Sequence, residues 1–148
     1  MTRFASRLVL ACALALALAP SLASAQRSDD LRSAFREVAF EWARADAAAV
    51  VRHMVPNGIL IDASDGRMGP LTDRQATAVL RQLFEQGETV AVDIVMLERV
   101  GGRPPRAFAS IIWTTRPRGT EVPVRRTVYF GLQLIDGAWR VSEIRLIP

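Results

Sequence analysis

The second half of the chain alternates apolar and polar residues with a period of two, which is the pattern of half-buried β-strands. The alternation predicts four strands, over residues 89–100, 107–115, 124–135 and 139–147. The last two strands are joined by Asp136-Gly137, the strongest short-range hairpin signal. Short, turn-rich connections predict an antiparallel meander, and one face of such a sheet must be covered by other elements.

The side-chain pattern also predicts which face of each strand is buried. On the first strand the more uniformly apolar face carries Val90, Val92, Ile94 and Met96. On the last strand Trp139 and Val141 share one face, whereas Ile144 and Leu146 share the other. We predict a β-bulge near Ser142–Glu143, because one extra residue would return all four side chains to the same face.

The preceding part of the chain has helical periodicity. A first helix is predicted from the apolar spacing of Leu31, Phe35, Val38, Trp42 and Ala45. Asp46 caps a shorter helix through Met54, and Thr72-Asp73-Arg74-Gln75 forms a capping box for a third helix that ends at Gly87. Between them we predict a short strand, 59–61, and a loop, 62–70. Helices followed by a meander predict an α+β fold, a curved antiparallel sheet with about three helices packed on one face.

Residues 1–25 have the features of a signal peptide. Arg3 and Arg7 precede an apolar run over 8–19, which is too short to span a bilayer, and Ala23-Ser24-Ala25 is a small-residue cleavage site. Cleavage after Ala25 leaves one domain, 26–148, that is exported to the periplasm or secreted. The alternative is lipidation at Cys12, but that cleavage site would cut the apolar run in half.

Composition excludes several classes of function for the processed chain. The one cysteine of the sequence, Cys12, lies in the predicted signal peptide and is absent after cleavage. Disulfides, thiolate catalysis and cysteine-bound metals are therefore not expected. Loss of Arg3 and Arg7 lowers the formal charge of +4 by two, which does not support nucleic-acid binding. We expect no metal, no cofactor and no transmembrane anchor.

The order of the elements resembles the nuclear transport factor 2-like, cystatin-like cone superfamily. The resemblance rests on the final strands, with Tyr129-Phe130-Gly131-Leu132 and Asp136-Gly137-Ala138-Trp139-Arg140-Val141. The helix that begins at Leu71-Thr72-Asp73-Arg74-Gln75-Ala76 is also similar to that of a group of exported bacterial domains of unknown function. The resemblance implies that the curved antiparallel sheet is cone-shaped, with the helices on its concave face. The superfamily includes isomerases, cyclases, dehydratases and hydrolases, and also members that only bind small molecules or dimerise. The isomerase pattern is not carried over, because the only tyrosine, Tyr129, is in a late strand.

Four residues are candidates for acid–base chemistry. His53 is either a general base or a helix-end histidine stabilised by the helix dipole. Asp62 and Asp65 are either a pair of bases at the cone mouth, one arm of a calcium site, or part of an ordinary turn; the alternating Asp/Asn pattern and distal Glu of a calcium loop are missing. Asp93 is either an acid or base within the cone or a solvent-facing strand residue, and Tyr129 would act beside one of these groups.

Two further groups of residues have more than one interpretation. The aromatic side chains either line a ligand pocket or form plain core, and they are Phe35, Trp42, Phe84, Trp113 and Tyr129. The arginines near the hairpin ends either contact an anionic ligand or a membrane surface, or they keep a solvated sheet edge from pairing with another strand. They are Arg103, Arg106, Arg116, Arg118, Arg125 and Arg126.

The functional hypothesis is an exported, non-catalytic module. It would bind a small apolar molecule of unknown identity or form a homodimer through the outer face of the sheet. One alternative is a small cone-fold enzyme of the isomerase, dehydratase or hydrolase type that acts on an apolar substrate. Another is a structural partner in a cell-envelope complex.

Overall fold

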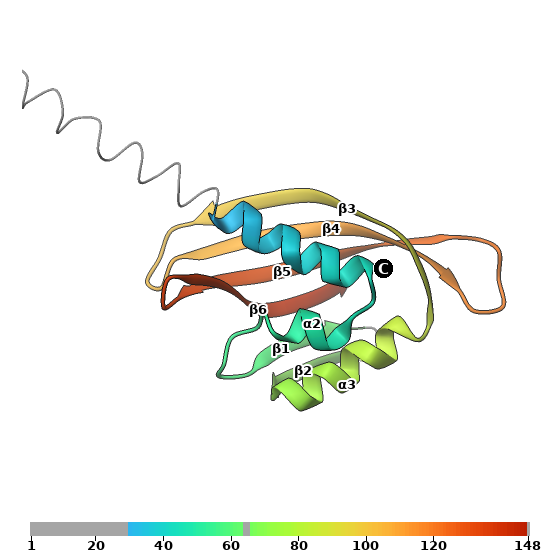
Figure 1. Cartoon of the computed structure of the whole chain (residues 1–148), viewed down its shortest axis with the longest axis horizontal. Coiled ribbons are helices and arrows are strands. Elements are labelled where there is room, and N and C mark those ends of the chain that lie inside the picture. Colours follow the sequence, from blue (N-terminus) through green and yellow to red (C-terminus); the bar gives the residue numbers. More distant parts are fainter. Residues whose placement is uncertain (1–29, 64–65, 148) are drawn as a thin grey trace, which may run out of the picture. The chain divides into compact units, whose positions relative to one another are not determined.

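The computed structural model describes residues 30–63 and 66–147 (Figure 1). Two compact units divide the chain, residues 1–33 and residues 34–148, and the described part of the first unit, 30–33, is helical. The second unit contains all the strands described below. The predicted signal peptide with its cleavage site near Ala25, together with Cys12 and Asp65, lies outside the described residues.

The second unit is an α+β fold, as predicted, and its mostly antiparallel sheet has six strands. Residues 34–43 are helical, and the next helices are α2 (Ala47–Val51) and α3 (Asp73–Phe84). The strands are β1 (Ile59–Ala63), β2 (Gly66–Leu71), β3 (Gly87–Val100), β4 (Arg106–Pro117), β5 (Val124–Ile135) and β6 (Ala138–Ile147). Their order in the sheet is β2-β1-β6-β5-β4-β3, and the pair β1–β6 is parallel.

The predicted helix starts are confirmed. The Asp46 carboxylate accepts a hydrogen bond from the Ala49 amide at 3.0 Å, and Thr72 and Gln75 form the reciprocal capping box. The predicted helix ends are wrong at two places. Because Met54 forms a bridge with Val141, α2 ends at Val51. Gly87 starts β3 instead of capping α3; a Cβ there would lie 2.6 Å from the carbonyl oxygen of Arg116.

The predicted loop over residues 62–70 is also wrong, because most of it is strand. Asp62 and Ala63 end β1, and Gly66–Leu71 forms β2, which pairs antiparallel with β1. Gly69 permits this pairing: it has a φ of 140°, and a Cβ there would lie 2.7 Å from the carbonyl oxygen of Ile59. A glycine and a proline within the segment hide a strand from pattern reading.

β-bulges decide which side chains face the helices. The predicted bulge in β6 is confirmed, since Gly131 pairs with Glu143 and Leu132 with Val141, which leaves Ser142 as the extra residue. Two bulges in β3, at Val90 and Val95, were not predicted. They put Met96 opposite Ser110, on the outer face, so the single apolar face expected for this strand is wrong beyond the bulges.

A cluster of aromatic rings fills the space between the helices and the inner face of the sheet. Trp42 lies at its centre, with edge-to-face contacts to Phe84, Trp113 and Phe130 at centroid distances of 5.1, 5.5 and 5.4 Å. Phe35 also contacts Phe130, at 5.3 Å. The Trp113 indole N–H donates to the Thr89 hydroxyl at 3.0 Å. Within the described part of the chain, the buried Trp42 indole N–H has no hydrogen-bond partner.

This difference between the two indoles is testable with Trp42→Phe and Trp113→Phe. Both changes remove a similar apolar area, but Trp113→Phe also breaks a hydrogen bond, whereas Trp42→Phe removes an unpaired buried donor. We expect Trp113→Phe to lower the free energy of unfolding by about 1 kcal/mol more than Trp42→Phe does. Urea unfolding measures both. Equal losses, or a larger loss for Trp42→Phe, would contradict this assignment of the core contacts.

Candidate functional site

The outer face of the sheet exposes a group of large apolar side chains. Phe108 on β4, Tyr129 on β5 and Ile147 on β6 are 47%, 40% and 43% exposed. With Gly131 and the backbone of Phe130 they surround a hollow of about 200 Å³, and Glu143 and Arg145 form its remaining wall. The hollow is on the face opposite the helices.

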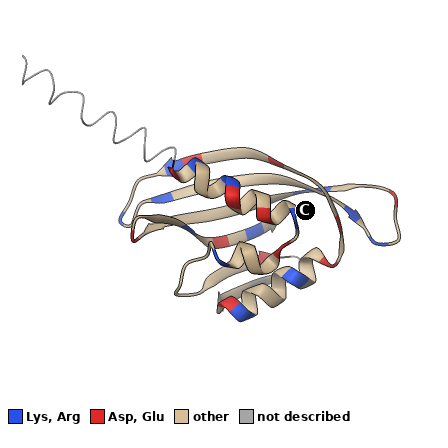
Figure 2. Cartoon of the chain, in the orientation of Figure 1, with Lys and Arg blue, Asp and Glu red and all other residues tan. Residues whose placement is uncertain are grey.

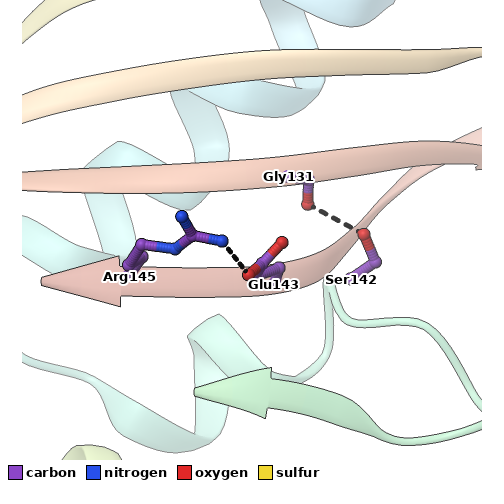
Figure 3. Close-up of polar contacts among 4 residues, drawn as sticks. All are labelled: Gly131, Ser142, Glu143 and Arg145. Atoms are coloured by element: carbon purple, nitrogen blue, oxygen red, sulfur yellow. Dashed lines mark hydrogen bonds and ion pairs between the residues drawn. The ribbon is translucent and has the colours of Figure 1, made fainter. Parts of the chain in front are cut away.

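The hollow exists because Gly131 has no side chain. In the registers of β4, β5 and β6, Phe108 is opposite Gly131 and Gly131 is opposite Glu143. A Cβ on Gly131 would lie 3.3 Å from Cβ of Glu143, so a larger residue there would crowd β6 slightly. The Ser142 hydroxyl, at the β6 bulge, donates to the Gly131 carbonyl at 3.2 Å (Figure 3).

An ion pair forms the polar wall of the hollow. Arg145 Nη2 donates to Glu143 Oε1 at 2.6 Å, and Figure 3 shows both side chains on the same strand. The hydrogen bond to Glu143 raises the pKa of Arg145 above its ordinary value, and the charges of Glu143 and Asp62 add to this effect. Arg145 therefore stays charged and paired with Glu143.

The four predicted acid–base candidates do not converge on one site. Asp62 is opposite Arg145, and Tyr129 is opposite Arg145 and Ser110, so both are on the outer face. Asp93 is opposite Ile112, on the same face but at the edge strand β3. His53 is on the other side of the sheet, where its charged neighbours include Glu37 and Glu41 of the first helix.

His53 has a mainly structural setting. Its carbonyl accepts from the Val141 amide at 2.8 Å, and its amide donates to the Val50 carbonyl at 3.1 Å. Burial lowers the pKa of His53 below its ordinary value; the charges of Glu37 and Glu41 oppose this effect, and those of Arg140 and Arg52 add to it.

The aromatic pocket candidates divide between two places. Phe35, Trp42, Phe84 and Trp113 are buried and pack against one another in the interior. Tyr129 alone of the five lies at the outer hollow. Sequence reasoning did not select Phe108, Glu143 or Arg145, and it did not use Gly131 as a site residue. The one available signal was a glycine inside a central strand, which often marks close approach of another group.

The arginines at the hairpin ends also separate. Arg103 and Arg106 are at the β3–β4 connection, and the other four are at the opposite end of β4 (Figure 2). There Arg116 pairs with Glu88 at 3.2 Å.

Over residues 30–63 and 66–147, no group of three His, Cys, Asp or Glu side chains could hold a metal ion. In the same ranges no helix has the length and apolar character needed to cross a bilayer.

Solved structures with the same fold identify the class of this domain. A ketosteroid isomerase-like protein from Erwinia carotovora atroseptica is 19% identical, with a TM-score of 0.64 over 80% of this chain and 92% of that chain. An NTF2-like protein of unknown function from Shewanella oneidensis is 12% identical, with a TM-score of 0.61 over 81% and 98%. A DUF4783 family protein from Bacteroides uniformis is 11% identical, with a TM-score of 0.62 over 75% and 93%.

The chain therefore has the nuclear transport factor 2-like, cystatin-like fold, which confirms the predicted resemblance. Bacterial proteins of unknown function are among those that share it. No family model and no curated protein matches the sequence. Because identities of this size establish the fold alone, function has to be argued from the residues of this chain.

The setting of His53 predicts a pH-dependent contribution to stability. Its pKa is lowered in the folded state, so the unfolded chain takes up a proton first as the pH falls. This contribution is complete above about pH 6.5 and is lost as the pH falls from there through the folded pKa. We expect His53→Gln to remove this loss, so that the stability difference between the two proteins changes between about pH 7.5 and pH 5. Urea unfolding at several pH values measures it, and parallel stability curves would contradict the prediction.

Proposed function

We propose that this domain is a non-catalytic module that forms a homodimer through the outer face of its sheet. The observation that carries the proposal is the position of the exposed apolar residues. Phe108, Tyr129 and Ile147 gather on the face of the sheet opposite the helices of the second unit, while aromatic rings pack against one another on the helix side. A contiguous apolar group on an otherwise solvated sheet face is typical of a protein–protein interface.

The arrangement of titratable groups favours this proposal over an enzyme. A cone-type acid–base mechanism needs at least two such groups inside the cavity, near the substrate. His53 is separated by the sheet from Asp62, Asp93 and Tyr129.

The outer face is large enough for a stable dimer. The four neighbouring strands β3, β4, β5 and β6, of 14, 12, 12 and 10 residues, give a projected area of roughly 750 Å² at ~4.8 Å spacing and ~3.3 Å per residue. The accessible area of such a rough surface is larger, and each partner in an interface of standard size buries about 800 Å². The face therefore approaches the size of a specific interface without help from any other surface.

The charges of the outer face also suit contact with a second copy. The strand registers place both signs on it: Asp62, Glu88, Asp93, Glu98 and Glu143 are acidic, and Arg106, Arg116, Arg125 and Arg145 are basic. A face with one sign of charge would repel an identical face, whereas a mixed face does not. We further propose that residues 1–25 direct export, so that the dimer forms in the periplasm or outside the cell.

Phe108→Arg tests the proposal, with Phe40→Arg as the matched control. Phe40 is on the first helix, away from the sheet, and is 58% exposed, more than Phe108. We expect Phe108→Arg to weaken the dimer at least thirtyfold, the equivalent of about 2 kcal/mol for a central interface residue, and Phe40→Arg to leave it unchanged. Light scattering after size exclusion measures the mass, and thermal unfolding shows that both variants are folded. An unmodified protein that is monomeric, or equal effects of the two variants, would contradict the proposal.

A further inference from the structure

Large and small side chains alternate like a checkerboard at the centre of the outer face. On the two central strands, β4 and β5, Phe108 is opposite Gly131. At the next pair of residues that face outward, Ser110 is opposite Tyr129. The two large residues are therefore on one diagonal and the two small residues on the other. Ser110 is only 3% exposed, whereas Phe108 and Tyr129 rise above it.

A checkerboard of this kind is complementary to itself. In a two-fold symmetric interface the axis lies between the two faces, and each copy contributes the same patch. An axis through the centre of the four residues, either along the strands or across them, places a large residue of one copy on a small residue of the other. The pattern is thus compatible with two orientations of a second copy.

The charges on the flanking strands distinguish these two orientations. An axis along the strands exchanges β3 with β6, so Glu98 would face the partner's Glu143 and repel it. An axis across the strands places each outward-facing residue over the next outward-facing residue of the same strand in the partner. Glu143 would then face the partner's Arg145. The intramolecular pair of Glu143 and Arg145 then becomes part of a ring of four alternating charges.

We infer that the two copies pair across such an axis, and that Tyr129 of each copy enters the hollow above the partner's Gly131. Phe108 then lies over the partner's Ser110. This inference rests on the proposed homodimer and specifies its contacts. The hollow has the right size, since a cavity of about 150 Å³ holds one benzene ring and this one is about 200 Å³. Its polar wall, Glu143 and Arg145, offers hydrogen bonds to the tyrosine hydroxyl.

The test is a rescue experiment that exchanges the large and small residues. Gly131→Leu fills the hollow and Tyr129→Ala removes the ring that enters it, so we expect each change alone to weaken the dimer at least tenfold. In the double variant the leucine of each copy replaces the partner's ring, and we expect binding at least tenfold tighter than the sum of the single effects predicts. The matched control, Gly131→Leu with Phe108→Ala, should show no such recovery.

Chemical cross-linking provides a second measurement that does not depend on the fit of a leucine. Copies carrying Tyr129→Cys are mixed with copies carrying Gly131→Cys, both with Cys12→Ser, and treated with a short bismaleimide, which spans stacked sheets about 10 Å apart. We expect a higher yield of cross-linked heterodimer from this mixture than when Phe108→Cys replaces Tyr129→Cys, because position 129 lies directly over the partner's position 131 and position 108 lies diagonally from it.

The outcomes separate the inference from the proposed function. Rescue by Tyr129→Ala together with the Tyr129–Gly131 cross-link supports the inference. The inference is overturned if dimerisation of the Gly131→Leu variant is rescued only by Phe108→Ala, or by neither change. The proposed homodimer still holds in both cases. An unmodified protein that stays monomeric overturns both.

Discussion

The packing of Trp42 against three other aromatic rings is the contact on which the rest of this structure depends. Its ring meets Phe84 of α3, Trp113 of β4 and Phe130 of β5, and so it joins the helices to the centre of the sheet. Edge-to-face pairs add about 0.5–1.5 kcal/mol each to the larger gain from burial. These rings hold the inner face of the sheet closed and occupy the volume in which a cone-type pocket would otherwise form.

In our proposal the functional surface is the face of the sheet opposite this aromatic cluster. There the side chains are large, apolar and exposed at Phe108, Tyr129 and Ile147, and the polar groups are paired charges. Such a surface can recognise a complementary surface. The fold is shared with a ketosteroid isomerase-like protein, but the fold alone does not decide the function, and our proposal of assembly rests on the outer face of this chain.

The sequence predicted most of the fold because most of its signals are local. The capping box at Thr72, the Asp136-Gly137 turn, with both residues at positive φ, and the bulge at Ser142 each depend on a few neighbouring residues. The bulges at Val90 and Val95 were missed because valine is as suited to a regular strand as to a bulge, so the register depends on β4. The candidate site was predicted only in part. The sequence indicated Tyr129 as a residue of a pocket in the cone, but its position at the outer hollow depends on cross-strand pairing with Ser110 and Arg145.

The central claim is that the outer face of the sheet is an interface and the interior is a core. Sedimentation equilibrium of the unmodified protein over a wide concentration range tests it most directly, because it measures mass without depending on shape. We expect a single dimeric species at micromolar concentration that dissociates only on dilution. A monomer that persists as the concentration is raised would contradict this account.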